Sequence, residues 1–155
     1  MHVREIALDP MKNPVILLVD EPEARVLPIW IGIAEAQAIA LALEGLRPER
    51  PLTHDLLLSA CNRLGGVVSK VVISDLRDGT FFAELHLTQQ GQSTVIDARP
   101  SDAIALALRS KAPIYVTPKV AEQAMDINDL IETSAEADSE EPEFSPETGN
   151  KRILH

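Results

Sequence analysis

The densest group of polar side chains in this 155-residue chain is the run Asp-Ala-Arg-Pro-Ser-Asp, from Asp97 to Asp102. The run lies where an expected strand ends and an expected helix begins. Backbone N–H groups, the Arg99 guanidinium and the Ser101 hydroxyl could bind a phosphate there. Asp97 and Asp102 could share a divalent cation, Mg²⁺ or Mn²⁺, through their carboxylate oxygens. The alternative is structural: Asp102 or Ser101 caps the helix and Arg99 pairs with Asp97. Spacing alone leaves both open.

Histidine supplies two further candidates. His54 follows a proline-rich linker at the start of another expected helix, where it could act as a general base or a ligand. The alternative is an ordinary helix start in which Asp55 favours the helix dipole. Glu84 and His86 lie on one face of an expected strand and form a weak ligand pair, although alternation there also fits a half-exposed strand. Glu35 is expected to be a dipole-compatible residue at a helix start.

An internal repeat predicts the elements that position these residues. The hexapeptide Ala-Ile-Ala-Leu-Ala-Leu occurs at 38–43 and again at 103–108, an offset of 65 residues. The register continues upstream without a gap, so we expect two related units, at about 3–45 and 67–110. Each is expected to contain three strands and then a helix. The predicted fold class is α+β, with two β-β-β-α repeats forming one mixed or antiparallel sheet, packing helices and short extra helices.

The individual elements follow from apolar patterns and turn residues. Strands are expected at 3–8, 15–19, 26–31, 67–76, 80–88, 93–97 and 113–116, and helices at 33–44, 53–64, 99–110 and 117–125. Asp78 and Gly79 predict a two-residue hairpin turn, and Thr53 is the expected N-cap of its helix. The two repeat helices are apolar nearly all round, which predicts burial and, for one of them, a place in a homo-oligomer interface.

The repeat also provides a comparison for the polar run. In the 65-residue register, Asp-Ala-Arg-Pro-Ser-Asp stands where the first unit has Gly-Ile-Ala-Glu-Ala-Gln, at 32–37. The first unit has neither an Asp nor an Arg there. The fold alone therefore does not require the cluster, which favours a functional role.

Composition limits the classes of function. The net charge is −10, and half of it falls in 132–155, which we expect to be a disordered acidic tail after a domain at 1–131. No basic field would attract nucleic acid, and only 3% of residues are aromatic, so any nucleic-acid substrate is expected to bind weakly. Cys61 is the single cysteine, which with the lack of a long apolar run favours a cytoplasmic protein without a membrane span.

Four segments in a fixed order stand out from the rest of the chain. They are Leu-Pro-Ile-Trp-Ile-Gly at 27–32 with Glu-Ala at 35–36, Pro-Leu-Thr-His-Asp-Leu at 51–56, Asp-Gly-Thr-Phe-Phe-Ala at 78–83, and Ile-Asp-Ala-Arg-Pro-Ser-Asp-Ala-Ile-Ala-Leu-Ala at 96–107. Together they resemble the bifunctional nuclease domain family. The resemblance implies a compact α+β fold and self-association. For plant members it also implies nuclease activity on RNA and DNA.

Two hypotheses of function result. In the first, the chain is a nuclease that hydrolyses phosphodiester bonds with the help of a metal ion: His54, Asp97, Arg99 and Asp102 are catalytic, Arg99 and Ser101 bind substrate, and Asp97 and Asp102 hold Mg²⁺ or Mn²⁺. In the second, the chain is a non-enzymatic oligomeric interaction module, and the same cluster only stabilises the strand–helix junction.

Overall fold

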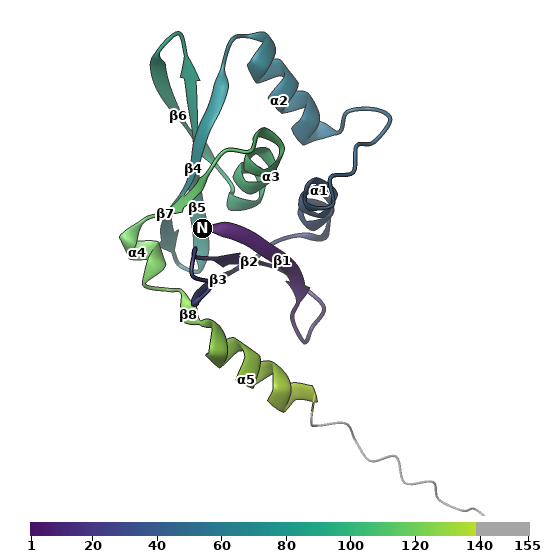
Figure 1. Ribbon diagram of the computed structural model, residues 1–155, viewed down its shortest axis with the longest axis vertical. Coiled ribbons are helices and arrows are strands. Elements are labelled where there is room, and N and C mark those ends of the chain that lie inside the picture. The colour runs from purple at the N-terminus through teal and green to yellow at the C-terminus, as the bar shows by residue number, and fades with distance from the viewer. Residues whose placement is uncertain (139–155) are drawn as a thin grey trace, which may run out of the picture.

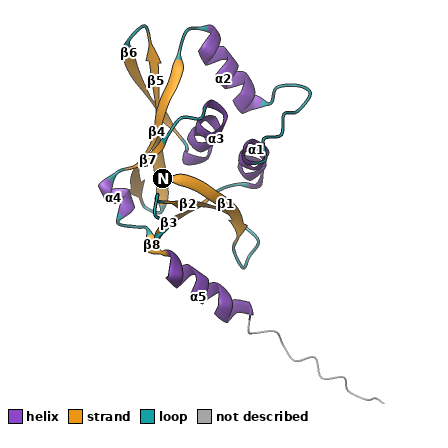
Figure 2. Ribbon diagram, viewed as in Figure 1, coloured by secondary structure: helices purple, strands orange, loops and turns teal. Residues whose placement is uncertain are grey.

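The computed structural model of the chain describes residues 1–138, which form two β-sheets and five helices (Figure 1, Figure 2). The strands are β1 (His2–Leu8), β2 (Pro14–Val19), β3 (Arg25–Trp30), β4 (Val67–Arg77), β5 (Thr80–Gln89), β6 (Gln92–Ala98), β7 (Ile114–Val116) and β8 (Met125–Asp126). The helices are α1 (Ile33–Leu43), α2 (Thr53–Arg63), α3 (Pro100–Ser110), α4 (Pro118–Ala121) and α5 (Ile127–Asp138). The predicted α+β class is therefore correct.

The strands form two four-stranded sheets, and the prediction of one shared sheet is wrong. Sheet A has the order β1-β2-β3-β8, and all its neighbouring strands are antiparallel. Sheet B has the order β6-β5-β4-β7, in which only the β4–β7 pair is parallel. Short turns join the strands within each half of the chain, so these strands pair locally. The two halves are separated by α1, α2 and the loop between them.

Each half of the chain passes through three strands into a helix, first β1–β3 and α1, then β4–β6 and α3. Asp78 and Gly79 join β4 to β5 with φ angles of 48° and 77°, so the predicted two-residue hairpin turn is confirmed. That the halves are copies of one unit stays a prediction, because a shared order of elements does not establish it.

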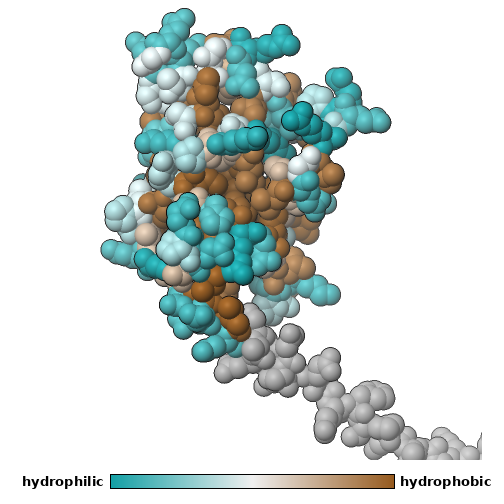
Figure 3. Space-filling model, viewed as in Figure 1, coloured by the Kyte–Doolittle hydropathy of each residue, from teal (hydrophilic) through white to brown (hydrophobic). Residues whose placement is uncertain are grey.

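The two identical hexapeptides have different surroundings. In α3, residues 103–107 are all buried in the main core. In α1 only Ala36 and Ile39 are buried, and Ile33 is 69% exposed. The prediction of a buried helix is correct for α3 and wrong for α1, because α3 packs against β4, β5, α1 and α2 whereas α1 packs only against α3 and β2 to any extent. Figure 1 shows α3 between sheet B and α1. Apolar side chains reach the surface on the face that carries these two helices (Figure 3).

Helix α2 begins differently from the prediction. Leu52 rather than Thr53 takes the N-cap position, and the Leu52 N–H donates to Oδ2 of Asp55 at 2.9 Å. Asp55 in the first turn therefore satisfies a backbone group that would otherwise lack a partner. No residue of α2 is fully buried.

The C-terminal elements are shorter and more numerous than predicted. The helix expected at 117–125 is only α4, because Met125 and Asp126 pair with β3 as β8. Helix α5 continues past the expected domain boundary at residue 131 and ends at Asp138. The rest of the expected acidic tail, 139–155, lies outside the described residues. Within residues 1–138, no helix is long and apolar enough to cross a membrane.

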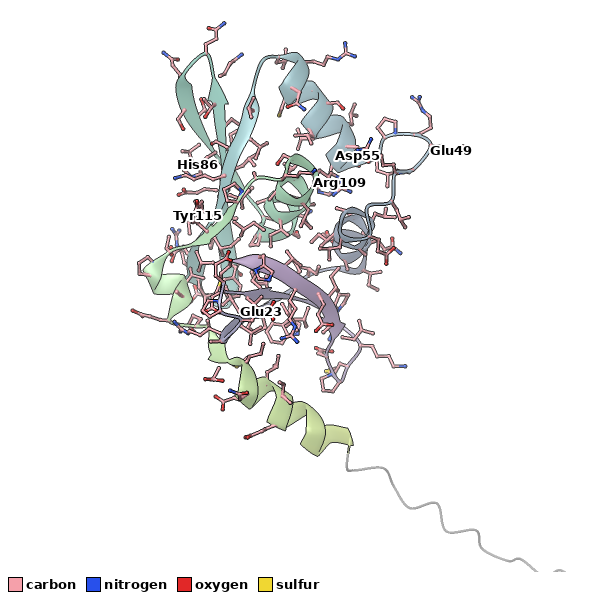
Figure 4. The ribbon with its side chains drawn as sticks, viewed as in Figure 1. Glu23, Glu49, Asp55, His86, Arg109 and Tyr115 are labelled. Atoms are coloured by element: carbon pink, nitrogen blue, oxygen red, sulfur yellow. The ribbon has the colours of Figure 1, made fainter. Side chains whose placement is uncertain are left out.

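A nearly buried guanidinium joins the three helices α1, α2 and α3. The side chain of Arg109, near the end of α3, is 10% exposed. Its Nε donates to Oδ1 of Asp55 in α2 at 2.8 Å, and its Nη2 donates to the Ala38 carbonyl of α1 at 3.0 Å. Nη1 donates to the Ala105 carbonyl within α3 at 3.0 Å. In Figure 4 the labelled side chains of Asp55 and Arg109 lie together between α2 and α3.

We predict that Arg109→Met destabilises the protein by about 2–4 kcal/mol, because it leaves the Asp55 carboxylate and the Ala38 carbonyl without their partner. Urea unfolding followed by circular dichroism measures this change. Arg50→Met is the matched control, since Arg50 is exposed, and it should change the free energy of unfolding by no more than about 0.5 kcal/mol. Equal effects of the two substitutions would contradict the role given to Arg109.

Candidate functional site

Four charged or ionisable side chains meet at the start of α3, and we call them the Arg99 cluster: Glu35, His54, Arg99 and Asp102. Arg99 is the N-cap residue of α3. Its Nε and Nη2 donate to Oδ2 and Oδ1 of Asp102 at 2.7 and 3.2 Å, a two-pronged ion pair within one helical turn. Its Nη1 donates to Oε1 of Glu35 in α1 at 2.9 Å. Arg99 therefore connects the first turns of both repeat helices.

His54 joins the cluster from α2. Its Nε2 lies 2.9 Å from Oδ1 of Asp102, and the His54 side chain is 15% exposed. Among the described residues, no buried side-chain nitrogen or oxygen lacks a hydrogen-bond partner. Nδ1 of His54 forms no hydrogen bond with these residues, so it must reach solvent. A histidine with one nitrogen held by a carboxylate and the other accessible has the arrangement of a general base.

Hydrogen bonds within the cluster favour its ionised forms. The Arg99 guanidinium holds the pKa of Asp102 below its ordinary value, against partial burial that acts to raise it, and His54 adds to the lowering. The pKa of Glu35 is lowered first by its own backbone N–H and then by Arg99. Asp102 and Glu35 in turn raise the pKa of Arg99. Near neutral pH the cluster thus contains two carboxylates around one guanidinium.

An open pocket of about 330 Å³ adjoins the cluster. It is lined by residues 29–32 at the end of β3, by the β4–β5 turn, and by the start of α3, and both Glu35 and Arg99 contribute to it. The Arg99 side chain is 64% exposed. Three of the five N–H donors of a guanidinium are used within the cluster, which leaves two that could reach a phosphate in the pocket.

The two remaining predicted residues occupy different positions. Ser101 is almost buried but lines the pocket beside Arg99, so its predicted contact with substrate has a place in the geometry. Asp97 is exposed on β6, directly opposite Glu84 of β5. Oε2 of Glu84 lies 2.9 Å from Nε2 of His86, so the predicted pair on one strand face does form. Arg99 bonds Asp102 and Glu35, rather than Asp97 as the structural alternative expected.

The strand register separates Asp97 from Asp102. Residues opposite each other in a ladder share a face, so Asp97 lies on the face of Glu84 and His86. The other face, with Ala83 and Leu85, packs in the core that includes α3. Within residues 1–132, no three His, Cys, Asp or Glu side chains are grouped to hold a metal ion. A cation shared by Asp97 and Asp102 stays a prediction without support from this geometry.

Glu35 is the member of the cluster that sequence reasoning did not assign. It was expected only to suit its helix dipole, and its contact with Arg99 spans 64 positions in sequence. The available signal was the repeat itself. The 65-residue register aligns the starts of α1 and α3, and packing of these two helices brings their first turns together.

Comparisons with known proteins show which family the sequence matches. Residues 15–128 match the family model of the bifunctional nuclease domain. An uncharacterized protein of Mycobacterium tuberculosis is 47% identical over 115 residues, which cover 74% of this chain and 68% of that protein.

Plant relatives are more distant and longer. Bifunctional nuclease 1 of Oryza sativa and bifunctional nuclease 2 of Arabidopsis thaliana are each 27% identical over 112 residues. These matches cover 70% of this chain but 34% of each plant protein. The chain thus resembles one part of each plant nuclease.

We predict that Asp102→Asn destabilises the fold by about 1 kcal/mol near neutral pH, because it weakens charge-assisted hydrogen bonds to Arg99 and His54. Asp97→Asn, at an exposed position, should have almost no effect. Because the folded-state pKa of Asp102 lies below its ordinary value of 3.8, its contribution is present above that pH and is lost as the pH falls below it. Urea unfolding at about pH 7 and about pH 3 measures both points. An Asp102→Asn difference that persists unchanged in acid would contradict the ion pair.

Proposed function

The chain belongs to the bifunctional nuclease domain family, and on that premise we propose that it hydrolyses phosphodiester bonds of RNA or DNA at the Arg99 cluster. The observation that supports this proposal best is the contact of His54 with Asp102, which leaves Nδ1 of His54 open to solvent. The same two residues also lie within segments that resemble the family.

In the proposed reaction His54 is the general base. Its Nε2–H donates to Asp102, which fixes the tautomer and leaves the Nδ1 lone pair to accept a proton from water. The water oxygen forms a bond to phosphorus while the bond from phosphorus to the leaving sugar oxygen breaks. The proton of the water passes to Nδ1, and the leaving oxygen takes a proton from solvent. Asp102 stabilises the imidazolium that forms.

Arg99 has two roles in the proposal. The two donors that it does not use within the cluster would bind phosphate oxygens and stabilise charge that develops on them. Its bonds to Asp102 and Glu35 hold the guanidinium in place, so little reorganisation is needed when substrate binds. Ser101, which lines the same pocket, would donate a further hydrogen bond.

A divalent cation, Mg²⁺ or Mn²⁺, is a separable part of the proposal. Such an ion would polarise the phosphoryl group and lower the pKa of a bound water. At Asp102 it would compete with Arg99 and His54, which already bond both carboxylate oxygens. The roles of His54 and Arg99 therefore do not depend on the cation.

We predict that the purified protein cleaves labelled single-stranded RNA and DNA, and that His54→Ala and Asp102→Asn each lower the rate at least about 100-fold, as loss of a general base does. Gel electrophoresis of the products measures the rate. His86→Ala is the matched control, since His86 also bonds a carboxylate but lies on the other face of sheet B, and it should retain activity.

Each arm of the assay has a separate meaning. Cleavage by His54→Ala at the wild-type rate would refute this site. Loss of cleavage in EDTA with recovery in Mn²⁺ would support the cation, whereas unchanged cleavage in EDTA would remove it from the proposal.

The second candidate function is an oligomeric interaction module, which the exposed apolar residues of the helical face favour. Ile33, Leu43, Leu56 and Leu57 from α1 and α2 are all at least 40% exposed. A second copy of the chain would cover them and would give α1 the buried environment that its sequence predicts.

We predict a homo-oligomer at micromolar concentration, with Leu43→Glu shifting the protein toward monomer because it places a charge in the interface. Analytical ultracentrifugation measures the mass. Met11→Glu is the control, since Met11 is exposed in the β1–β2 turn instead. A wild-type protein that sediments as a monomer would rule out the oligomer while leaving the nuclease proposal intact.

A further inference from the structure

A second pocket, of about 620 Å³, opens on the other side of the α2 start from the Arg99 cluster. It is lined by the end of α1, the loop from 44 to 52, α2 and the end of α3. Three cationic side chains line it, namely Arg47, Arg109 and Lys111, against Asp55 and Glu49. From these residues we infer that the pocket binds a phosphate monoester of nucleotide size, a ligand distinct from the substrate proposed above.

The cations supply the phosphate site. Asp55 is neutralised by Arg109, whose side chain is nine-tenths buried and has two N–H donors beyond the three that it uses. Arg47 and Lys111 form no ion pair with any residue that the structure describes, and both are exposed. Glu49 lies on the outer part of the loop in Figure 4, away from Arg109. The pocket thus has an excess of positive charge in a chain whose net charge is −10, which selects an anion.

The remaining lining residues fit an attached organic group. Leu46, Leu58 and Leu108 form an apolar wall, and Leu46 is 55% exposed although it is a large apolar residue. Ser59 adds a hydroxyl. A nucleoside offers both a flat apolar surface and hydroxyls beside its phosphate, and the volume is within the range of small-molecule sites.

Backbone features restrict the loop that forms one wall of the pocket. Gly45, with φ at 66°, ends α1, and the N–H of Leu46 donates back to the Leu41 carbonyl at 3.0 Å. Pro48 and Pro51 restrict the loop that follows. A loop restricted in this way loses little conformational entropy when a ligand binds.

Lys111 has a backbone conformation that adds to the argument. It ends α3 in the left-handed region, with φ at 59°, whereas α1 and α2 are followed by Gly45 and Gly65 in that region. A lysine there is less favourable than a glycine. The positive charge that Lys111 brings to the pocket would explain why a lysine occupies this position although it weakens the end of α3.

Isothermal titration calorimetry on the full chain measures the affinity for adenosine 5′-monophosphate, adenosine and inorganic phosphate. Adenosine 5′-monophosphate should bind more tightly than either of the other two. Arg47→Gln and Lys111→Gly should each weaken it roughly five-fold or more, whereas Arg63→Gln, an equal charge change at the far end of α2, should not. Lys111→Gly should at the same time raise the melting temperature, because it relieves the unfavourable backbone conformation.

Amide shifts in ¹⁵N spectra locate the ligand. Changes at Gly45, Ser59 and Lys111 support the inference, and changes confined to Thr80 and Ser101 would place the ligand at the Arg99 cluster and overturn it. Unchanged affinity in Arg47→Gln and Lys111→Gly, or no binding of adenosine 5′-monophosphate, would overturn it as well. His54→Ala should bind as the wild type does, so failure of the nuclease proposal and failure of this inference are distinguishable.

Discussion

The position of α2, and with it His54, depends on polar contacts that α3 forms near both of its ends. Arg109 near the end of α3 bonds Asp55, and Asp102 near its start bonds His54. These are consecutive residues in the first turn of α2. Because α2 contains no fully buried residue, apolar burial contributes less to its docking than it does for α3. Polar contacts therefore determine where the first turn of α2 lies.

This arrangement has a cost that the rest of the core must offset. Taking the Arg109 guanidinium out of water is unfavourable, and the bonds to Asp55 and to two backbone carbonyls offset that desolvation only because all are well formed. The apolar residues of α3 supply the rigid support. Ile104, together with Ile73 and Val71 of β4, is fully buried in one core, so the arginines at the two ends of α3 are held at a fixed separation.

Local features of the sequence predicted the individual elements well. Turn residues such as Asp78 and Gly79, and the proline at the start of α3, have conformational preferences that act over a few residues. Two of the features that were predicted wrongly, the single sheet and the burial of α1, depend on contacts across the fold. Whether six strands form one sheet or two, and which copy of an identical hexapeptide is buried, is decided by packing that the hexapeptide itself does not encode.

The same distinction applies to the site. The run from Asp97 to Asp102 predicted Arg99 and Asp102, but alternation along β6 turns Asp97 to the opposite face. Glu35 and Asp55 were read as helix-start residues, a reading that accounts for their local position but not for their arginine partners. Each carboxylate has two oxygens, so one residue can serve both its own helix and a distant guanidinium. A prediction made only from the position of an acidic residue in its own helix therefore misses the second partner that the residue has when another helix packs alongside.

The distribution of charge finally separates the two pockets. Around Arg99 two carboxylates outnumber one guanidinium, so a phosphate bound there gains from directed hydrogen bonds more than from net attraction, and its affinity should be low. That suits a site that must release a product. Around Arg109 the balance is reversed, since Arg109 matches the carboxylate of Asp55, and Arg47 and Lys111 outnumber Glu49 among the other charged residues of the pocket. This balance favours an anion on that side of α2, whereas the reaction that we propose takes place on the side that contains His54.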